Sequence, residues 1–110
     1  MNINGMVRGF ISKEYDPEYF LKHIAITIEH QLKEWDPYYE VLIMKMVDYH
    51  FIVKNKGEYY TIIISEEEVR NLQKKDLFAL DQFIWKELTR QGVILYKGYG
   101  NYLENVLSDM

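Results

Sequence analysis

The sequence predicts an α+β fold: a single α+β domain over residues 1–110 in which a small antiparallel sheet is covered by helices. Three observations support this fold class. Apolar residues recur at helical spacing over 16–35, β-branched and aromatic residues fill 40–64 around a turn signal, and a second helical pattern covers 66–91. A chain of 110 residues buries roughly two thirds of its unfolded surface, which suffices for one hydrophobic core.

The first helix is predicted over residues 16–35. Asp16 is a favoured N-cap residue, and Pro17 suits the first helical position because the amide that it lacks has no intrahelical partner there. The apolar residues that share one face are Phe20, Leu21, Ile24, Ala25, Ile28, Leu32 and Trp35. Asp36-Pro37 is expected to end the helix, since a residue before proline is driven out of the α region.

A β-hairpin is predicted over residues 40–64. In Asn55-Lys56-Gly57, the glycine can supply the positive φ of a tight turn between two strands. An unbroken strand over 40–53 would be about 45 Å long, which exceeds a domain of this size, so we expect a bend near Asp48. Residues 49–53 are then expected to pair with 59–63. This leaves 41–46 to pair with another segment, for which the N-terminal residues 6–11 are the candidate strand.

The second helical region is predicted to begin with a capping box formed by Ser65 and Glu68. In this motif the hydroxyl accepts the third amide of the helix, and the carboxylate accepts the N–H of the cap residue. The pattern allows one helix over 66–91 or two helices, and Asp76 as a new N-cap favours two. Gly92 is expected to end the region. Beyond it, 93–96 is predicted to form a short strand, and 102–108 a return strand or a small helix.

Composition excludes several classes of function. The chain has no cysteine, which removes disulfides, thiolate nucleophiles and thiolate metal sites. The net charge of −4 disfavours affinity that rests on phosphate contacts. Residues 1–9 lack the pattern of a signal peptide, and no apolar run approaches the roughly 20 residues of a spanning helix. We therefore expect a cytoplasmic protein that does not bind membranes.

Candidate residues for chemistry are few. His23 and His30 lie on the first helix roughly 10 Å apart along its axis, too far to share one metal ion. His30 and Glu34 have a spacing that a metal accepts, but no second such pair is present. The glycines around Tyr99 lack the third glycine of a dinucleotide-binding loop. We expect no catalytic residue, no metal ion and no cofactor.

Tyrosine is the most unusual component, with ten residues. Its ring buries a large area while its hydroxyl can stay in water, and this residue type concentrates at protein–protein contacts. Tyr59 and Tyr60 point to opposite faces of their predicted strand, so one of them must leave the core side. The candidate interaction surface comprises Tyr59, Tyr60, Tyr96, Tyr99 and Tyr102.

The favoured hypothesis is a noncatalytic protein–protein interaction module that self-associates as a homo-oligomer, a homodimer in its simplest form, or binds another protein. The physical reason is that a small sheet has exposed edge strands and is stabilised when a partner covers them.

The alternative hypothesis is a nucleic-acid-binding domain. The segment 77–94 resembles the recognition helix of a winged helix running into its wing, which would occupy 93–105 after the shorter helix 66–74. Asp81 and Glu87 on that helix oppose the approach of phosphates, so nucleic acid is the less favoured partner. An enzyme is a third hypothesis, and it requires a polar cleft that brings His50 beside two acids.

Overall fold

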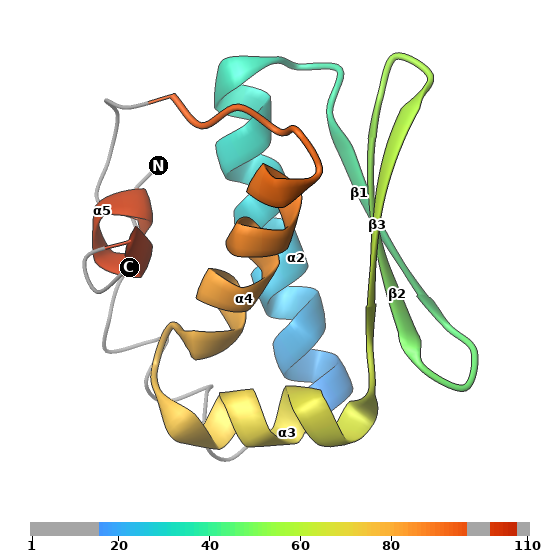
Figure 1. Cartoon of the computed structure of the whole chain (residues 1–110), viewed down its shortest axis with the longest axis vertical. Helices are drawn as coiled ribbons and strands as arrows, with labels where there is room; N and C mark the ends of the chain where they lie inside the picture. Colours follow the sequence, from blue (N-terminus) through green and yellow to red (C-terminus); the bar gives the residue numbers. More distant parts are fainter. Residues whose placement is uncertain (1–15, 97–101, 108–110) are drawn as a thin grey trace.

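The computed structural model describes residues 16–96 and 102–107. Its strands form one antiparallel sheet in the order β1-β2-β3, with the bounds β1 (Glu40–Lys45), β2 (Tyr49–Asn55) and β3 (Glu58–Ile64). The described helices are α2 (Pro17–Trp35), α3 (Glu66–Lys75), α4 (Ala79–Arg90) and α5 (Tyr102–Leu107). Helices α2 and α4 lie on the same side of the sheet, α3 runs from the end of β3 across the ends of α2 and α4, and α5 lies beyond α4 (Figure 1). The predicted α+β class is confirmed.

Helix α2 has the predicted bounds. Pro17 is its first residue and Asp16 its N-cap, although the Asp16 carboxylate forms no hydrogen bond with the amides of the helix. The first turn closes through the backbone instead, where the N–H of Phe20 donates to the carbonyl of Asp16 at 3.0 Å. At the other end Asp36 is extended, with φ −151° and ψ 116°, as the following proline requires.

The turn between β2 and β3 consists of Lys56 and Gly57, which both have positive φ, 50° and 87°. Two positive values in a two-residue loop are the mark of the mirror-image turn whose twist matches that of paired strands. Glycine adopts this conformation without strain, whereas Lys56 must hold its side chain in the left-handed region. The predicted hairpin is therefore confirmed at the predicted position.

The predicted break near Asp48 is also confirmed, but the prediction for residues 41–46 was wrong. Strand β1 pairs with β2, in a register that runs from Glu40 opposite Lys54 to Lys45 opposite Tyr49. Strand β2 thus lies at the centre of the sheet, with β1 and β3 at its edges. A neighbour in sequence needs only a short loop to pair, which costs little closure entropy. The alternative partner, residues 6–11, lies outside the described residues.

Helices α3 and α4 are separate, as the interpretation of Asp76 predicted. The capping box at the start of α3 is complete, since the Ser65 hydroxyl accepts from the N–H of Glu68 and the Glu68 carboxylate accepts from the N–H of Ser65. Asp76, however, is not the N-cap of α4. It is the C-cap of α3, and its carboxylate accepts the N–H of Phe78, the residue that caps α4.

The segment after α4 differs from the prediction. Gly92, with φ 110°, ends the helical region as expected. The N–H of Val93 then donates to the carbonyl of Leu88 at 2.9 Å, so the backbone stays attached to the end of α4. As a result 93–96 has no strand, contrary to the prediction. Of the two alternatives for 102–108, the described residues 102–107 form the helix α5.

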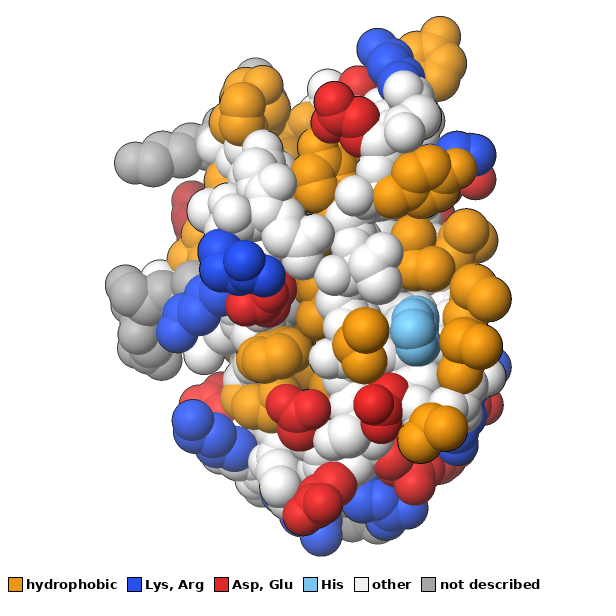
Figure 2. Space-filling model, turned by 45° about the vertical axis from the view of Figure 1, so that its right-hand side comes forward, with side chains coloured by type: hydrophobic (Ala, Val, Ile, Leu, Met, Phe, Trp, Pro, Cys, Tyr) orange, Lys and Arg blue, Asp and Glu red, His pale blue; other side chains and the backbone are white. Residues whose placement is uncertain are grey.

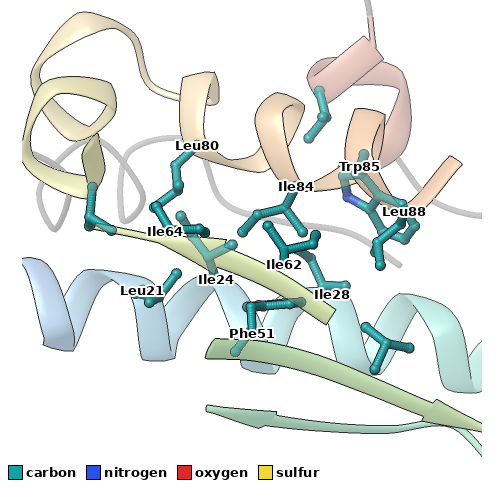
Figure 3. Close-up of a cluster of buried hydrophobic side chains, with 14 of the residues drawn as sticks. Leu21, Ile24, Ile28, Phe51, Ile62, Ile64, Leu80, Ile84, Trp85 and Leu88 are labelled. Carbon is teal, nitrogen blue, oxygen red and sulfur yellow. The ribbon is translucent and has the colours of Figure 1, made fainter. Parts of the chain in front are cut away.

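The hydrophobic core lies between the sheet and the helices. Figure 3 shows side chains of α2, β2, β3 and α4 pointing toward one another, among them Ile24, Phe51, Ile62 and Ile84. Helix α2 packs against β1 and helix α4 against β3, so the two helices together cover the inner side of all three strands. The other side of the sheet faces away from every helix that the structure describes (Figure 1).

Candidate functional site: the outer face of the sheet

The side of the sheet that faces away from α2 and α4, here called the outer face, carries mostly apolar side chains. Alternation along a strand directs every second residue to each side. Tyr49, Phe51 and Val53 of β2 are buried on the inner side, so the residues between them point outward. The register places the outward residues in three rows across the strands.

These rows run from a polar to an apolar end of the outer face. The polar row, next to the turn between β2 and β3, consists of Glu40, Lys54 and Tyr59. The middle row consists of Leu42, Ile52 and Thr61. The apolar row, next to the turn between β1 and β2, consists of Met44, His50 and Ile63.

Large apolar side chains of the outer face are open to solvent. The exposed fraction is 48% for Leu42, 52% for Met44, 57% for Ile63 and 61% for Tyr59. Ile52 is half-buried on the central strand, beside Leu42 and diagonal to Met44 and Ile63. Figure 2 shows this surface, with hydrophobic side chains gathered over the strands and a histidine among them. A contiguous patch of this kind on a small protein marks a contact surface more often than isolated apolar residues do.

The hairpin tip next to the apolar row is also apolar and exposed. Met46 is 65% exposed and Val47 is 93% exposed. The tip is held by a hydrogen bond from the N–H of Met46 to the carbonyl of Asp48 at 3.0 Å. Two apolar side chains at a tight turn, a place where polar residues are usual, extend the apolar end of the outer face.

On each edge strand of the sheet, one backbone group is occupied by a side chain. On β1, the N–H of Val41 donates to Oε2 of Glu29 in α2 at 2.8 Å. On β3, Nε2 of Gln91 donates to the carbonyl of Thr61 at 2.9 Å. Both backbone groups point away from β2, so they belong to the free edges, where an added strand would need them. The edges are therefore less suited to pairing than the outer face is to packing.

The tyrosines of the predicted interaction surface lie in different environments. Tyr59 is on the outer face, whereas Tyr60 is half-buried on the inner side and its hydroxyl donates to Glu58 at 2.7 Å. Tyr96 is 56% exposed and contacts the Trp35 ring. Tyr102 is fully buried, which removes its side chain from any binding surface. Tyr99 lies outside the described residues. Among the four of these tyrosines that the structure describes, only Tyr59 shares a face with the exposed apolar residues of the sheet.

Electrostatics on the described surface is arranged in local pairs. The Arg90 guanidinium donates to the Glu87 carboxylate at 2.8 Å, which lowers the pKa of Glu87 and raises that of Arg90. At the polar row, Nζ of Lys54 lies 5.9 Å from the centroid of the Tyr59 ring. Within residues 16–96 and 102–107, no group of three or more His, Asp or Glu side chains could hold a metal ion.

The histidines and acids singled out in the sequence are not brought into one site. His50 lies on the outer face between Met44 and Ile63. Glu34 accepts a hydrogen bond from Nε2 of Gln31 at 3.1 Å. Asp81 is buried and accepts a hydrogen bond from the Tyr102 hydroxyl. These placements bring His50 beside apolar side chains rather than beside two acids.

The helix compared with a recognition helix has its apolar side in the core. Leu80, Ile84, Trp85 and Leu88 of α4 are buried. The cation at its end, Arg90, is paired with Glu87. The segment that would form the wing has no strand over 93–96 and is helical over 102–107. None of these features favours the winged-helix alternative.

Comparisons of the chain with protein-family models, with curated proteins and with solved structures find no match. Among the described residues, no helix is long and apolar enough to cross a membrane.

Proposed function

We propose that this protein is a noncatalytic, cytoplasmic interaction module that self-associates, with the outer face of the sheet as its binding surface and a second copy of the chain as the occupant. The observation that supports the proposal is the run of apolar side chains across all three strands on the side that α2 and α4 leave open. Burial of apolar surface is the main favourable contribution to most protein association.

A second copy fits this surface because it presents a sheet of the same size and composition. Two sheets pack face to face about 10 Å apart with interdigitating side chains, as in a sandwich. The polar row also suits a copy of itself, since Glu40 and Lys54 carry opposite charges on adjacent strands. A dimer would then bury the apolar residues and leave the charged row at its rim, which is the usual arrangement of an interface.

The size of the outer face sets the expected affinity. Three strands of six or seven residues cover roughly 14 Å by 20 Å. This footprint is smaller than that of a standard interface, which buries about 800 Å² on each partner. We therefore expect a reversible dimer with a dissociation constant in the micromolar range rather than a permanent assembly.

Sedimentation velocity over a concentration series, from about 1 µM to about 1 mM, tests the proposal. The expected result is a monomer–dimer equilibrium that Ile63→Lys shifts toward monomer. Ile26→Lys on α2 is the matched control, because Ile26 and Ile63 are both 57% exposed. Circular dichroism establishes that both variants are folded. A strict monomer at every concentration overturns the proposal, as does an equal loss of dimer in both variants.

A further inference from the structure

We infer that the two copies are related by a twofold axis parallel to the strands, so that β2 of one copy lies over β2 of the other. This inference rests on the proposed function. It follows from the order of the three rows on the outer face, which makes the two ends of that face chemically different.

The possible symmetric arrangements are few. When two identical faces are pressed together, the twofold axis that relates them lies in the plane between them. Aligned sheet packing keeps the strands of the two sheets within about 30° of each other. The axis is therefore close to parallel or close to perpendicular to the strands, and the two cases bring different rows together.

An axis perpendicular to the strands places the polar row of one copy on the apolar row of the other. Lys54 would then lie over His50 of the second copy, and Glu40 over its Met44. The charged side chains of the polar row would then pack against a row that offers apolar groups and no opposite charge, and each apolar row would lose an apolar partner. The arrangement also leaves no apolar side chain of one copy opposite the apolar row of the other except Tyr59.

An axis parallel to the strands places like rows together. Met44 of one copy then lies over Ile63 of the other, and His50 lies over its own counterpart. In the polar row, Lys54 lies over its counterpart near the axis, and each lysine has Glu40 of its own copy on one side and Glu40 of the second copy on the other. The two lysines and two glutamates form a neutral group at a solvated rim, and the apolar groups are buried against one another.

The exposed hairpin tip between β1 and β2 also favours the axis parallel to the strands. Met46 and Val47 lie beyond the apolar row. In the parallel arrangement the tips of both copies lie at one end of the dimer, next to two apolar rows. In the perpendicular arrangement each tip lies next to a polar row. Only the first arrangement gives these two highly exposed side chains apolar surface to cover.

Chemical cross-linking distinguishes the two arrangements, and the absence of cysteine allows single thiols to be introduced without side reactions. Each variant is treated with a short bismaleimide at a concentration where the dimer is populated. Ile52→Cys lies near the centre of either dimer and should cross-link in both. His50→Cys should cross-link about tenfold more than Leu42→Cys when the axis is parallel to the strands, and the order reverses when it is perpendicular. Ile26→Cys on α2 is the negative control.

A mixed experiment gives an independent answer. Met44→Cys and Ile63→Cys are each expected to cross-link poorly alone and efficiently when mixed, because they face each other only across the parallel axis. If Ile52→Cys cross-links but the mixed pair and His50→Cys do not, the inferred arrangement is overturned while the proposed self-association stands. If the protein sediments as a dimer and Ile52→Cys does not cross-link above the Ile26→Cys control, the outer face is the wrong surface and both are overturned.

Discussion

The Tyr102 hydroxyl donates a hydrogen bond to Oδ2 of Asp81 at 2.5 Å and accepts one from Nε1 of Trp85 at 3.1 Å. All three side chains are fully buried, so α5 is joined to α4 by polar contacts inside the core. Nε2 of Gln82 also donates to the carbonyl of Val106 at 2.8 Å, which adds a second link between the two helices. A buried carboxylate is tolerated only with such donors, and this requirement fixes where α5 can dock.

Replacing Tyr102 with phenylalanine should therefore destabilise the fold. The variant removes a donor to the Asp81 carboxylate and the acceptor of the Trp85 N–H. We expect the free energy of unfolding to fall by about 1–3 kcal/mol, measured by urea titration. Tyr38→Phe, at a position that is 65% exposed, is the control and should change stability by less than about 0.5 kcal/mol. Equal stability of the two variants would contradict the structural role of the Tyr102 hydroxyl.

Tyr60 should titrate at unusually high pH. Its hydroxyl donates to Glu58, and this hydrogen bond together with burial raises the pKa of Tyr60 to about 12. Because the folded state has the higher pKa, the interaction stabilises the fold below about pH 10 and is lost as the pH rises through about 12. NMR titration of Cζ-labelled tyrosine should show the pKa falling in Glu58→Gln and unchanged in Glu40→Gln. An unaltered Tyr60 titration in Glu58→Gln would rule out the carboxylate as the cause.

Substitution of Gly57 should destabilise the fold because of its backbone conformation and not because of a steric clash with neighbouring atoms. Its φ is 87°, and a Cβ added there would meet no atom within 4 Å. Gly57→Ala should therefore lower the free energy of unfolding by roughly 1–2 kcal/mol through left-handed strain alone. Gly57→Asn should cost less, since asparagine tolerates this region. Thermal unfolding of the two variants checks the order, and an equal cost would point to a cause other than φ.

A permanent charge at His50 should weaken the proposed dimer. The inferred axis brings His50 of each copy against the other, so His50→Lys would bury two like charges. We expect the dissociation constant to rise at least about tenfold, equivalent to about 1.4 kcal/mol. His50→Leu should lower it, and His30→Lys on the exposed part of α2 should leave it unchanged. Sedimentation equilibrium provides the constants, and a His50→Lys dimer of unchanged affinity would exclude His50 from the contact.

The helices were predictable because their signals are local. Asp16-Pro17, the capping box of Ser65 and Glu68, and Gly92 each act within one turn of chain, and the structure has helix ends at or next to all of them. The partner of β1 was not predictable in this way, because pairing depends on which segments meet in space. The same holds for 93–96, whose strand-like residues are attached to α4 through the N–H of Val93.

The outer face of the sheet was not predicted from the sequence, and the reason differs from that for strand pairing. The predicted surface rested on a residue type, tyrosine, whereas the outer face is defined by register. A usable signal was present in the strands themselves: residues 41–44, 51–53 and 62–64 are uninterrupted apolar runs, and such runs are typical of strands that are buried on both sides. When strands carry apolar residues on both sides and helices cover only one side of the sheet, the other side is left as an exposed apolar face. Tyr102 could not be excluded from the surface in advance, because its burial depends on the docking of α5 against α4.

The side chains of Glu29 and Gln91, which occupy backbone groups at the two margins of the sheet, affect how large an assembly can become. A strand with unoccupied margins can recruit another molecule, which then offers its own margin to the next, and the process ends in fibrils. Here strand addition at either edge would have to displace a side-chain hydrogen bond, whereas the apolar surface is fully used once two molecules have met. Association of this protein should therefore stop at a closed pair, even at the high concentrations at which exposed isoleucine and methionine would otherwise favour precipitation.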